Sequence, residues 1–260
     1  MCYPFNAQPP EPPGARRPIR ERDLVLTSRD GTRFAAFFAA PEQPSGAGIV
    51  VLPDVRGLFP FYEELARGFA QQGISAVAID YFGRTAGVGK RGEDFPFRDY
   101  VMQTKAAQVA EDVGAAVAFL RSPEGGRCAD IFTVGFCFGG AHSWLQGANG
   151  HGLAGVIGFY GRPGNTFDGA PGPVARAKEM ACPALALMGG ADQGIPMEQV
   201  EELKRAWAEA GIEHEVVVYP GAPHSFFDRA YKEHAEAAAD AWRRCLAFIA
   251  AHRSTVAAER

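Results

Sequence analysis

The sequence predicts an α/β fold, in which eight strands form one mostly parallel sheet with helices on both faces. From about residue 20 onward, short β-rich runs alternate with longer segments of helical periodicity. Two of the short runs, Ile49–Leu52 and Ala76–Ile79, are continuously apolar, which is typical of strands that helices cover on both faces. The chain has 260 residues, of which 47% are hydrophobic, and this is enough for one large domain of this class.

The positions of the elements follow from this alternation. The first two strands are expected to pair as an antiparallel hairpin, because no helical segment separates them. The expected strands are 22–27, 33–40, 48–53, 75–79, 130–134, 154–159, 183–188 and 213–218. Helices are expected where apolar residues recur at intervals of three and four, in stripes that begin at Tyr62, Val109, Val200 and Ala238.

Both ends of the chain are expected to lie outside this domain. Residues 1–18 are interpreted as a flexible arm, because the prolines between positions 9 and 13 have no amide donors and cannot build a helix or an inner strand. One α/β domain is expected over 19–253, and residues 254–260 are expected to form a short tail.

Composition excludes several classes of protein. The net charge is −4 at a sequence pI near 5.9, so no positive field favours nucleic acid as a partner. No stretch of 18 apolar residues suits a bilayer, and the N-terminus lacks the apolar segment of an export signal. The five cysteines are scattered without a CxxC pair, which argues against a disulfide framework or a zinc site. We therefore expect a cytoplasmic protein without contact to membrane or nucleic acid.

Two long irregular segments follow predicted strands. Residues 82–103 contain four glycines, and residues 161–174 are rich in glycine and proline. Open α/β sheets bind their ligands beyond the carboxyl ends of the strands, and long loops in compact domains are commonly functional. Both segments are therefore expected to form walls of a pocket.

The most informative motif is the G-x-C-x-G pattern around Cys137. A strand that runs into this pattern and continues as a helix holds the central residue on a tight, strained turn above the sheet. The thiol would sit at a helix N-terminus, whose partial positive charge favours a thiolate, and the Phe138 amide would face a developing oxyanion. The alternative is a buried structural cysteine at the end of an apolar strand.

An acid and a histidine follow in the order that a nucleophile, acid and base would take. Asp192 comes directly after one apolar strand, and His224 comes directly after the last strand. Taken singly, Asp192 could cap a helix and His224 could be a turn residue. Together with Cys137, they match the chain order of α/β-hydrolases, which favours a catalytic interpretation.

These motifs resemble those of the dienelactone hydrolase family. The resemblance covers about residues 20 to 250 and is carried by G-F-C-F-G-G, G-x-x-D-x-x-x-P and P-H-S-F-F, of which the cysteine at the turn is the most specific. It implies Cys137 as the nucleophile, His224 as the general base and acid, and Asp192 as the residue that orients His224.

The resemblance also implies roles for four further residues. Asp54 occupies a position where the family has a carboxylate that interacts with the resting thiol, although glutamate is usual there; otherwise it caps a turn. The amide of Val55 would be the second oxyanion donor. Arg84 matches one position where family members hold a substrate carboxylate, and Arg229 approximates another; a planar guanidinium is well suited to this role. Asp228 stands where a closer match to the second arginine would lie.

No cofactor or metal is implied. The other histidines show no metal-ligand spacing, and Gly135–Gly140 does not fit a dinucleotide-binding loop. The sequence therefore predicts a hydrolase of a small, anionic carboxylic ester or lactone that works through a Cys-His-Asp triad. The alternatives are a broad-specificity esterase or thioesterase, a non-catalytic ligand-binding relative, and a cysteine peptidase.

Overall fold

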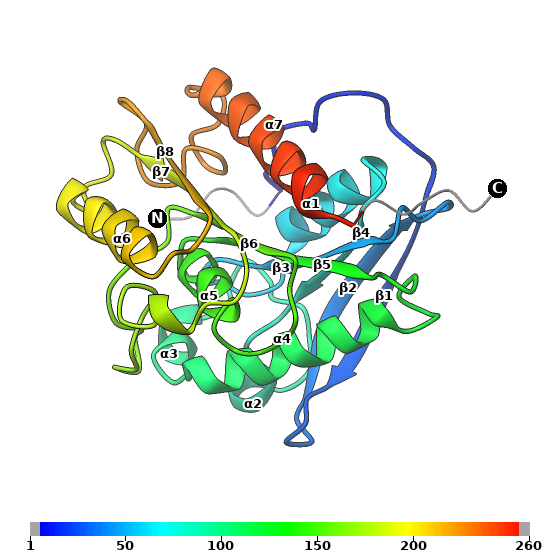
Figure 1. The fold of residues 1–260 in the computed structure, drawn as a ribbon. Coiled ribbons are helices and arrows are strands. Elements are labelled where there is room, and N and C mark those ends of the chain that lie inside the picture. The colour runs from blue at the N-terminus through cyan, green and yellow to red at the C-terminus, as the bar shows by residue number, and fades with distance from the viewer. Residues whose placement is uncertain (1–5, 255–260) are drawn as a thin grey trace.

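The computed structural model describes residues 6–254, and these form one eight-stranded sheet with helices on both faces (Figure 1). The sheet order is β1-β2-β4-β3-β5-β6-β7-β8. β1 pairs antiparallel with β2, as does β2 with β4, and the other neighbours are parallel. The strands are β1 Ile19–Thr27, β2 Arg33–Pro41, β3 Ala47–Leu52, β4 Ser75–Ile79, β5 Asp130–Phe136, β6 Gly155–Phe159, β7 Ala184–Gly189 and β8 His214–Tyr219. The predicted fold class and the N-terminal hairpin are confirmed.

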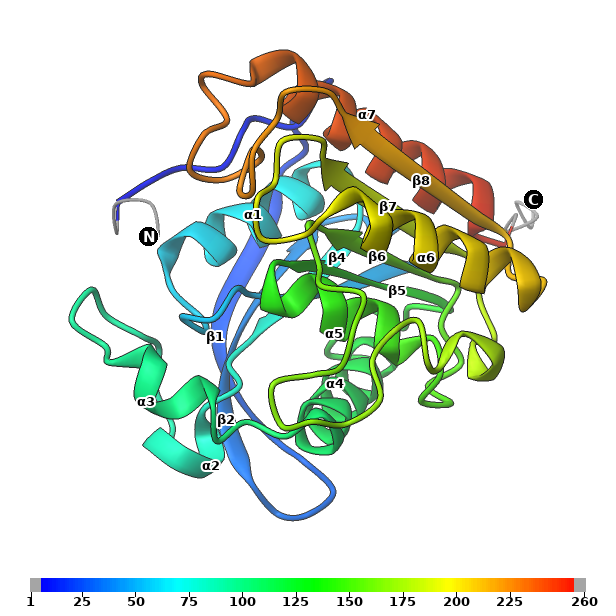
Figure 2. The ribbon, with the colours of Figure 1, turned by 90° about the vertical axis from the view of Figure 1, so that its left-hand side faces the viewer.

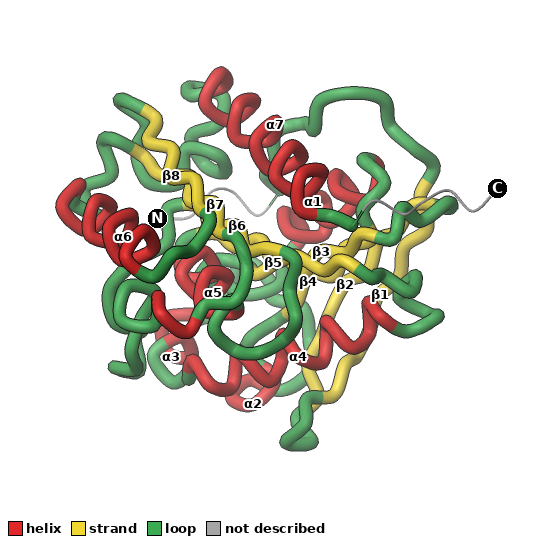
Figure 3. Tube along the Cα trace, viewed as in Figure 1, coloured by secondary structure: helices red, strands yellow, loops and turns green. Residues whose placement is uncertain are grey.

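The helices divide between the two faces of the sheet (Figure 3). α1 and α7 cover one face, whereas α4 and α5 cover the other, and α6 packs beside α5 through the rings of Trp144 and Trp207. The helices are α1 Pro60–Gln71, α2 Gly83–Ala86, α3 Phe97–Val101, α4 Ala106–Arg121, α5 Phe138–Gln146, α6 Met197–Glu209 and α7 Ala235–His252, with a short 3-10 helix at Ala177–Glu179. The four apolar stripes of the sequence lie on α1, α4, α6 and α7.

Alternating residues of the central strands enter two separate cores. Ile49 and Val51 of β3 face the core beneath α1 and α7, whereas Val50 and Leu52 face the core beneath α4. All four side chains are fully buried, and burial of such a side chain stabilises the fold by about 1.5–3 kcal/mol. This two-sided burial explains why these strands are continuously apolar. Within the described residues, the helices include none that is long and apolar enough to span a bilayer.

The segment 82–103 is more ordered than the sequence suggests. It contains α2 and α3, which have only four and five residues. Tertiary contacts hold it in place: the rings of Phe95 and Tyr100 stack with centroids 5.0 Å apart, and Arg91 forms an ion pair with the buried Asp80. In Figure 2 this segment extends from the rest of the domain beside the carboxyl ends of the strands.

Residues 6–18, which belong to the expected flexible arm of residues 1–18, contact the domain at two points. Pro10 is buried, and its carbonyl accepts a 2.8 Å hydrogen bond from Nε1 of Trp242 on α7. The amide of Arg17 donates to the carbonyl of Gln71 at the end of α1. Proline lacks a donor but keeps its acceptor, which is sufficient for this attachment. Residues 1–5, including Cys2, and 255–260 of the expected tail lie outside the described residues.

Candidate active site

Cys137 lies at the tight turn between β5 and α5. Its φ of 55° and ψ of −113° place it in a region that costs a non-glycine residue about 1–3 kcal/mol. Two glycines make this turn possible. A Cβ atom at Gly135 would lie 1.9 Å from the carbonyl oxygen of Gly139, and one at Gly139 would lie 2.2 Å from that of Leu52. The local sequence therefore folds into a strained turn that holds the thiol out above the sheet.

The N-terminus of α5 lies directly behind this thiol. Phe138 is the first residue of this nine-residue helix, where backbone amides have no acceptor within the helix and the helix dipole is positive. Val55 lines the same cavity as Cys137, from the turn after β3. The structure thus places both amides that were predicted as oxyanion donors on segments next to the cysteine.

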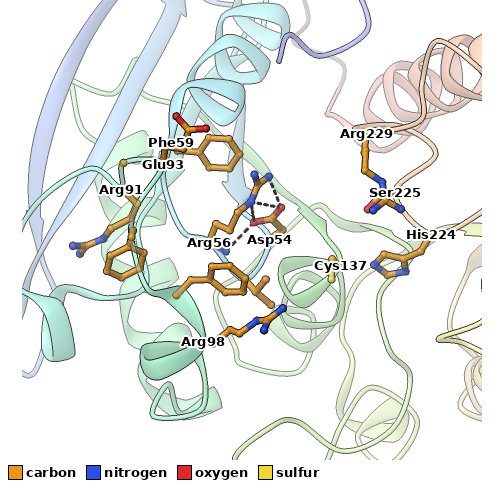
Figure 4. A pocket seen from close by; sticks show the side chains of 14 residues that line it. Asp54, Arg56, Phe59, Arg91, Glu93, Arg98, Cys137, His224, Ser225 and Arg229 are labelled. Carbon is orange, nitrogen blue, oxygen red and sulfur yellow. Dashed lines mark hydrogen bonds and ion pairs between the residues drawn. The ribbon is translucent and has the colours of Figure 1, made fainter. Parts of the chain in front are cut away.

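His224 and Asp192 are joined by a hydrogen bond of 2.6 Å from Nδ1 of the imidazole to Oδ2 of the carboxylate. The side chain of Asp192 is 2% exposed, and its other oxygen accepts a 2.8 Å bond from the Gly194 amide. This pairing leaves Nε2 of His224 to face Cys137, and Figure 4 shows the ring beside the sulfur. Burial alone would lower the pKa of His224, but the hydrogen bonds and negative charges of Asp192 and Cys137 raise it to about 10.

Tyr160 and Asp228 form a second polar pair next to His224. The ring of Tyr160 lies 4.9 Å from the imidazole, and its hydroxyl donates a 3.0 Å hydrogen bond to Oδ2 of Asp228. Asp228 is 2% exposed. Burial, together with the negative charge of Asp54, raises the pKa of the Asp228 carboxyl to about 6, although donors from Arg229, Tyr160 and Ser225 oppose this shift. Sequence analysis assigned no role to Tyr160 or Asp228.

We predict that Asp228→Asn changes the pH dependence of stability. The folded-state pKa of about 6 lies above the unfolded value of about 3.9, so the protonated carboxyl stabilises the fold below pH 4, and this contribution is lost as the pH rises through 6. The variant cannot titrate there. The wild-type free energy of unfolding should therefore fall by about 2–3 kcal/mol relative to the variant between pH 4 and pH 7. Urea unfolding at several pH values measures this, and a pH-independent difference would contradict it.

A cavity of about 590 Å³ opens in front of Cys137 and His224, and we call it the arginine cavity (Figure 4). Its lining includes Arg56, Arg91, Arg98 and Arg229, together with Asp54 and Glu93. Asp54 is 5% exposed, and Arg56 binds its carboxylate through Nε and Nη2, the latter at 2.8 Å. The Arg56 guanidinium also lies 4.0 Å from the centroid of the Phe59 ring. Asp54 is thus placed in the cavity wall, and its carboxylate is held by an arginine that sequence analysis missed.

Arg84 does not reach this cavity. It lies on α2, where Nη1 binds both carboxylate oxygens of the buried Asp112 at 2.7 Å and Nη2 lies 2.9 Å from Asp30. The predicted role of Arg84 in binding substrate is therefore not supported by its position, because Asp112 on α4 holds the guanidinium elsewhere. Arg229 lines the arginine cavity, and Arg98 of α3 lines it as well.

A smaller cavity of about 160 Å³ lies on the other side of Cys137 and His224. We call it the phenylalanine cavity, because Phe138 and Phe167 form its walls with His142. Phe167 belongs to the segment 161–174, so this segment lines a pocket as the sequence predicts, and 82–103 likewise lines the arginine cavity. In the described part of the chain, no group of three or more His, Cys, Asp or Glu side chains is arranged to hold a metal.

The sheet order, together with loops that carry Cys137, Asp192 and His224 beyond three parallel strands, defines an α/β-hydrolase. The family model of the dienelactone hydrolase family matches residues 34–253, so the chain belongs to this family and to the hydrolases. A protein of Salmonella typhimurium (strain LT2) named "Putative carboxymethylenebutenolidase" is 31% identical over 232 residues, which cover 85% of this chain and 83% of that protein.

Two further comparisons agree with this assignment. A Methylorubrum extorquens protein with the same name is 33% identical over 200 residues, which cover 75% of this chain and 69% of that one. The crystal structure of a "Putative Dienelactone Hydrolase" from Klebsiella pneumoniae aligns with a TM-score of 0.81 at 29% identity, covering 90% of this chain and 99% of the other. Sequence and fold therefore lead to the same family.

Proposed function

We propose that this protein hydrolyses small carboxylic esters or lactones through a thioester formed on Cys137. The observation that supports this most strongly is the 2.6 Å hydrogen bond between Nδ1 of His224 and Asp192. This bond leaves Nε2, the other ring nitrogen, on the side of the thiol of Cys137. A buried carboxylate on Nδ1 fixes the tautomer and stabilises the imidazolium, which is the requirement for a histidine that takes and returns a proton.

The proposed reaction has two halves. In the first, the thiol proton passes to Nε2 of His224, and the sulfur of Cys137 attacks the carbonyl carbon. The resulting oxyanion accepts hydrogen bonds from the amides of Phe138 and Val55. The bond from carbon to the alcohol oxygen then breaks, and that oxygen takes the proton from His224. For a lactone, the released hydroxyl stays on the acyl chain.

In the second half, water attacks the thioester carbon. His224 takes a proton from this water, and the same two amides stabilise the oxyanion. The bond from carbon to sulfur breaks, and the sulfur takes the proton from His224, which frees a carboxylic acid and regenerates the thiol of Cys137 and the neutral imidazole. Asp192 keeps the imidazole in place through both halves, and Tyr160 with Asp228 supports the ring from behind.

The arginine cavity favours an anionic substrate. Four arginines and two carboxylates line it. Arg56 and Arg91 bind Asp54 and Asp80. We assign the substrate carboxylate to the guanidinium groups of Arg98 and Arg229, which line the same cavity as Cys137 and His224. Arg229 keeps the role that the sequence predicted, and Arg98 takes the role that was predicted for Arg84.

We predict that Arg98→Ala raises KM for a lactone that bears a free carboxylate by about tenfold and leaves a neutral aryl ester unaffected, because only the first substrate needs the positive charge. Arg229→Ala should act in the same direction. Steady-state kinetics on the two substrates measures this. Arg84→Gln is the matched control, since its charge lies outside the cavity, and it should keep the wild-type preference.

A broad-specificity esterase is the second candidate, and the apolar walls of the phenylalanine cavity favour it. Equal loss on both substrates in Arg98→Ala, or faster wild-type turnover of the neutral ester, would favour this candidate. Either result would remove the carboxylate requirement and keep the proposed triad.

A further inference from the structure

His142 is a buried histidine whose ring nitrogens have no assigned role in the proposed reaction. It lies on α5, one turn after Cys137, and is 2% exposed. Its Nδ1 is fully buried and has no hydrogen-bond partner among the described residues. A buried donor or acceptor without a partner costs about 1–3 kcal/mol, which an apolar side chain at the same place would avoid.

This histidine is neutral at physiological pH. Burial lowers its pKa to about 4, and the negative charge of Asp168 only partly offsets the shift. A neutral imidazole carries a proton on one nitrogen and accepts a hydrogen bond on the other. His142 is therefore a polar recognition group rather than a fixed positive charge.

The surroundings of His142 define what it can recognise. It forms part of the wall of the phenylalanine cavity, which also reaches Cys137 and His224. The ring of Phe138 lies 4.3 Å from the imidazole and 5.6 Å from the ring of Phe167, between centroids. The volume of about 160 Å³ is close to that of a cavity of roughly 150 Å³ that holds benzene in another protein. The cavity thus suits one flat six-membered ring.

We propose that the phenylalanine cavity binds a hydroxyl-bearing six-membered ring of the substrate, with His142 accepting the hydrogen bond of that hydroxyl. This site deepens the proposed function and rests on it, because the ring would belong to the ester attacked by Cys137. The two cavities then divide the substrate: the arginine cavity binds its carboxylate, and the phenylalanine cavity binds its ring on the other side of the scissile carbonyl.

Binding of 3-fluorophenol and 3-fluorotoluene, followed by fluorine NMR, tests this site. The two probes have similar size, and only the first can donate a hydrogen bond to His142. We expect the phenol to bind at least about fivefold more tightly than the toluene. His142→Phe should bring this ratio to about one, whereas His142→Gln, which keeps an acceptor, should preserve part of the preference. Phe167→Trp should weaken both probes by filling the cavity.

His151→Phe is the matched control. His151 is a partly buried histidine, but its Nε2 lies 3.1 Å from Gln146 Oε1 and it lines a different groove, so the preference for the phenol should remain. Equal binding of the two probes to the wild type would overturn the proposal. A ratio that His142→Phe leaves unchanged, or affinities that Phe167→Trp leaves unchanged, would overturn it as well.

The titrations are carried out on the wild-type protein and its His142, Phe167 and His151 variants, and neither probe carries an ester, so their outcome does not depend on turnover. Hydrolysis by the wild type without selective phenol binding would remove this proposal and keep the proposed function. Selective binding without hydrolysis would keep the ring-binding cavity but remove the proposed function, and with it the assignment of that ring to an ester substrate.

Discussion

Cys137→Ala should lower kcat/KM for both a neutral aryl ester and a carboxylated lactone by at least about 1,000-fold, because the variant lacks the sulfur that attacks the substrate carbonyl in the proposed reaction. Residual activity would come from the oxyanion donors and the binding cavities alone. The change removes a sulfur atom from a turn whose backbone is determined by Gly135 and Gly139, so the fold should persist. Steady-state kinetics and thermal unfolding of the variant measure both effects.

Cys182→Ala is the matched control for this experiment. Cys182 is buried in the core and lies outside both cavities, so its replacement should leave kcat/KM close to that of the wild type. Full activity of the Cys137→Ala protein would contradict the proposed nucleophile.

Asp192→Asn should lower kcat/KM by about 100- to 10,000-fold, because an amide cannot hold Nδ1–H and stabilise the imidazolium as a buried carboxylate does. The pKa of His224, which lies at about 10, should fall, since the hydrogen bond and charge of Asp192 both raise it. The alkaline limb of the rate of Cys137 alkylation by iodoacetamide should therefore move to lower pH.

Asp130→Asn provides the comparison for this variant. Asp130 binds Ser254 at the start of β5, away from both cavities, and its replacement should alter neither kcat/KM nor the alkylation profile. An unchanged alkaline limb in Asp192→Asn would show that this carboxylate does not orient His224.

The elements that the sequence predicted well are those whose signals are local. The continuous apolar run of β3 and the stripe on α4 each reflect burial on the faces that the structure shows. α2 and α3 escaped prediction because helices of four and five residues carry no stripe and depend on tertiary contacts, such as the stacking of Phe95 on Tyr100. The contact of Pro10 could not be predicted either, because the donor to its carbonyl is Trp242, which lies near the other end of the sequence.

The residues of the candidate site also differ in whether their signals in the sequence are local. The turn at Cys137 could be predicted because its glycines and strand lie within a few residues of it. The position of the Arg84 side chain could not be predicted, because it depends on an ion pair with Asp112, which lies on a separate helix. Tyr160 and His142 gave no signal either, since a buried aromatic or histidine has the same appearance in a sequence whether it packs in a core or faces a cavity.

The most direct test of the account is mass spectrometry of the protein quenched in acid during turnover of an aryl ester. The account predicts a mass increase equal to that of the acyl group, located on the peptide that contains Cys137 and removed by neutral hydroxylamine, as expected for a thioester. Asp192→Asn should change the amount of this adduct but not its position. Steady turnover with no acyl group on Cys137 under these conditions, or with the acyl group on another residue, would contradict the account.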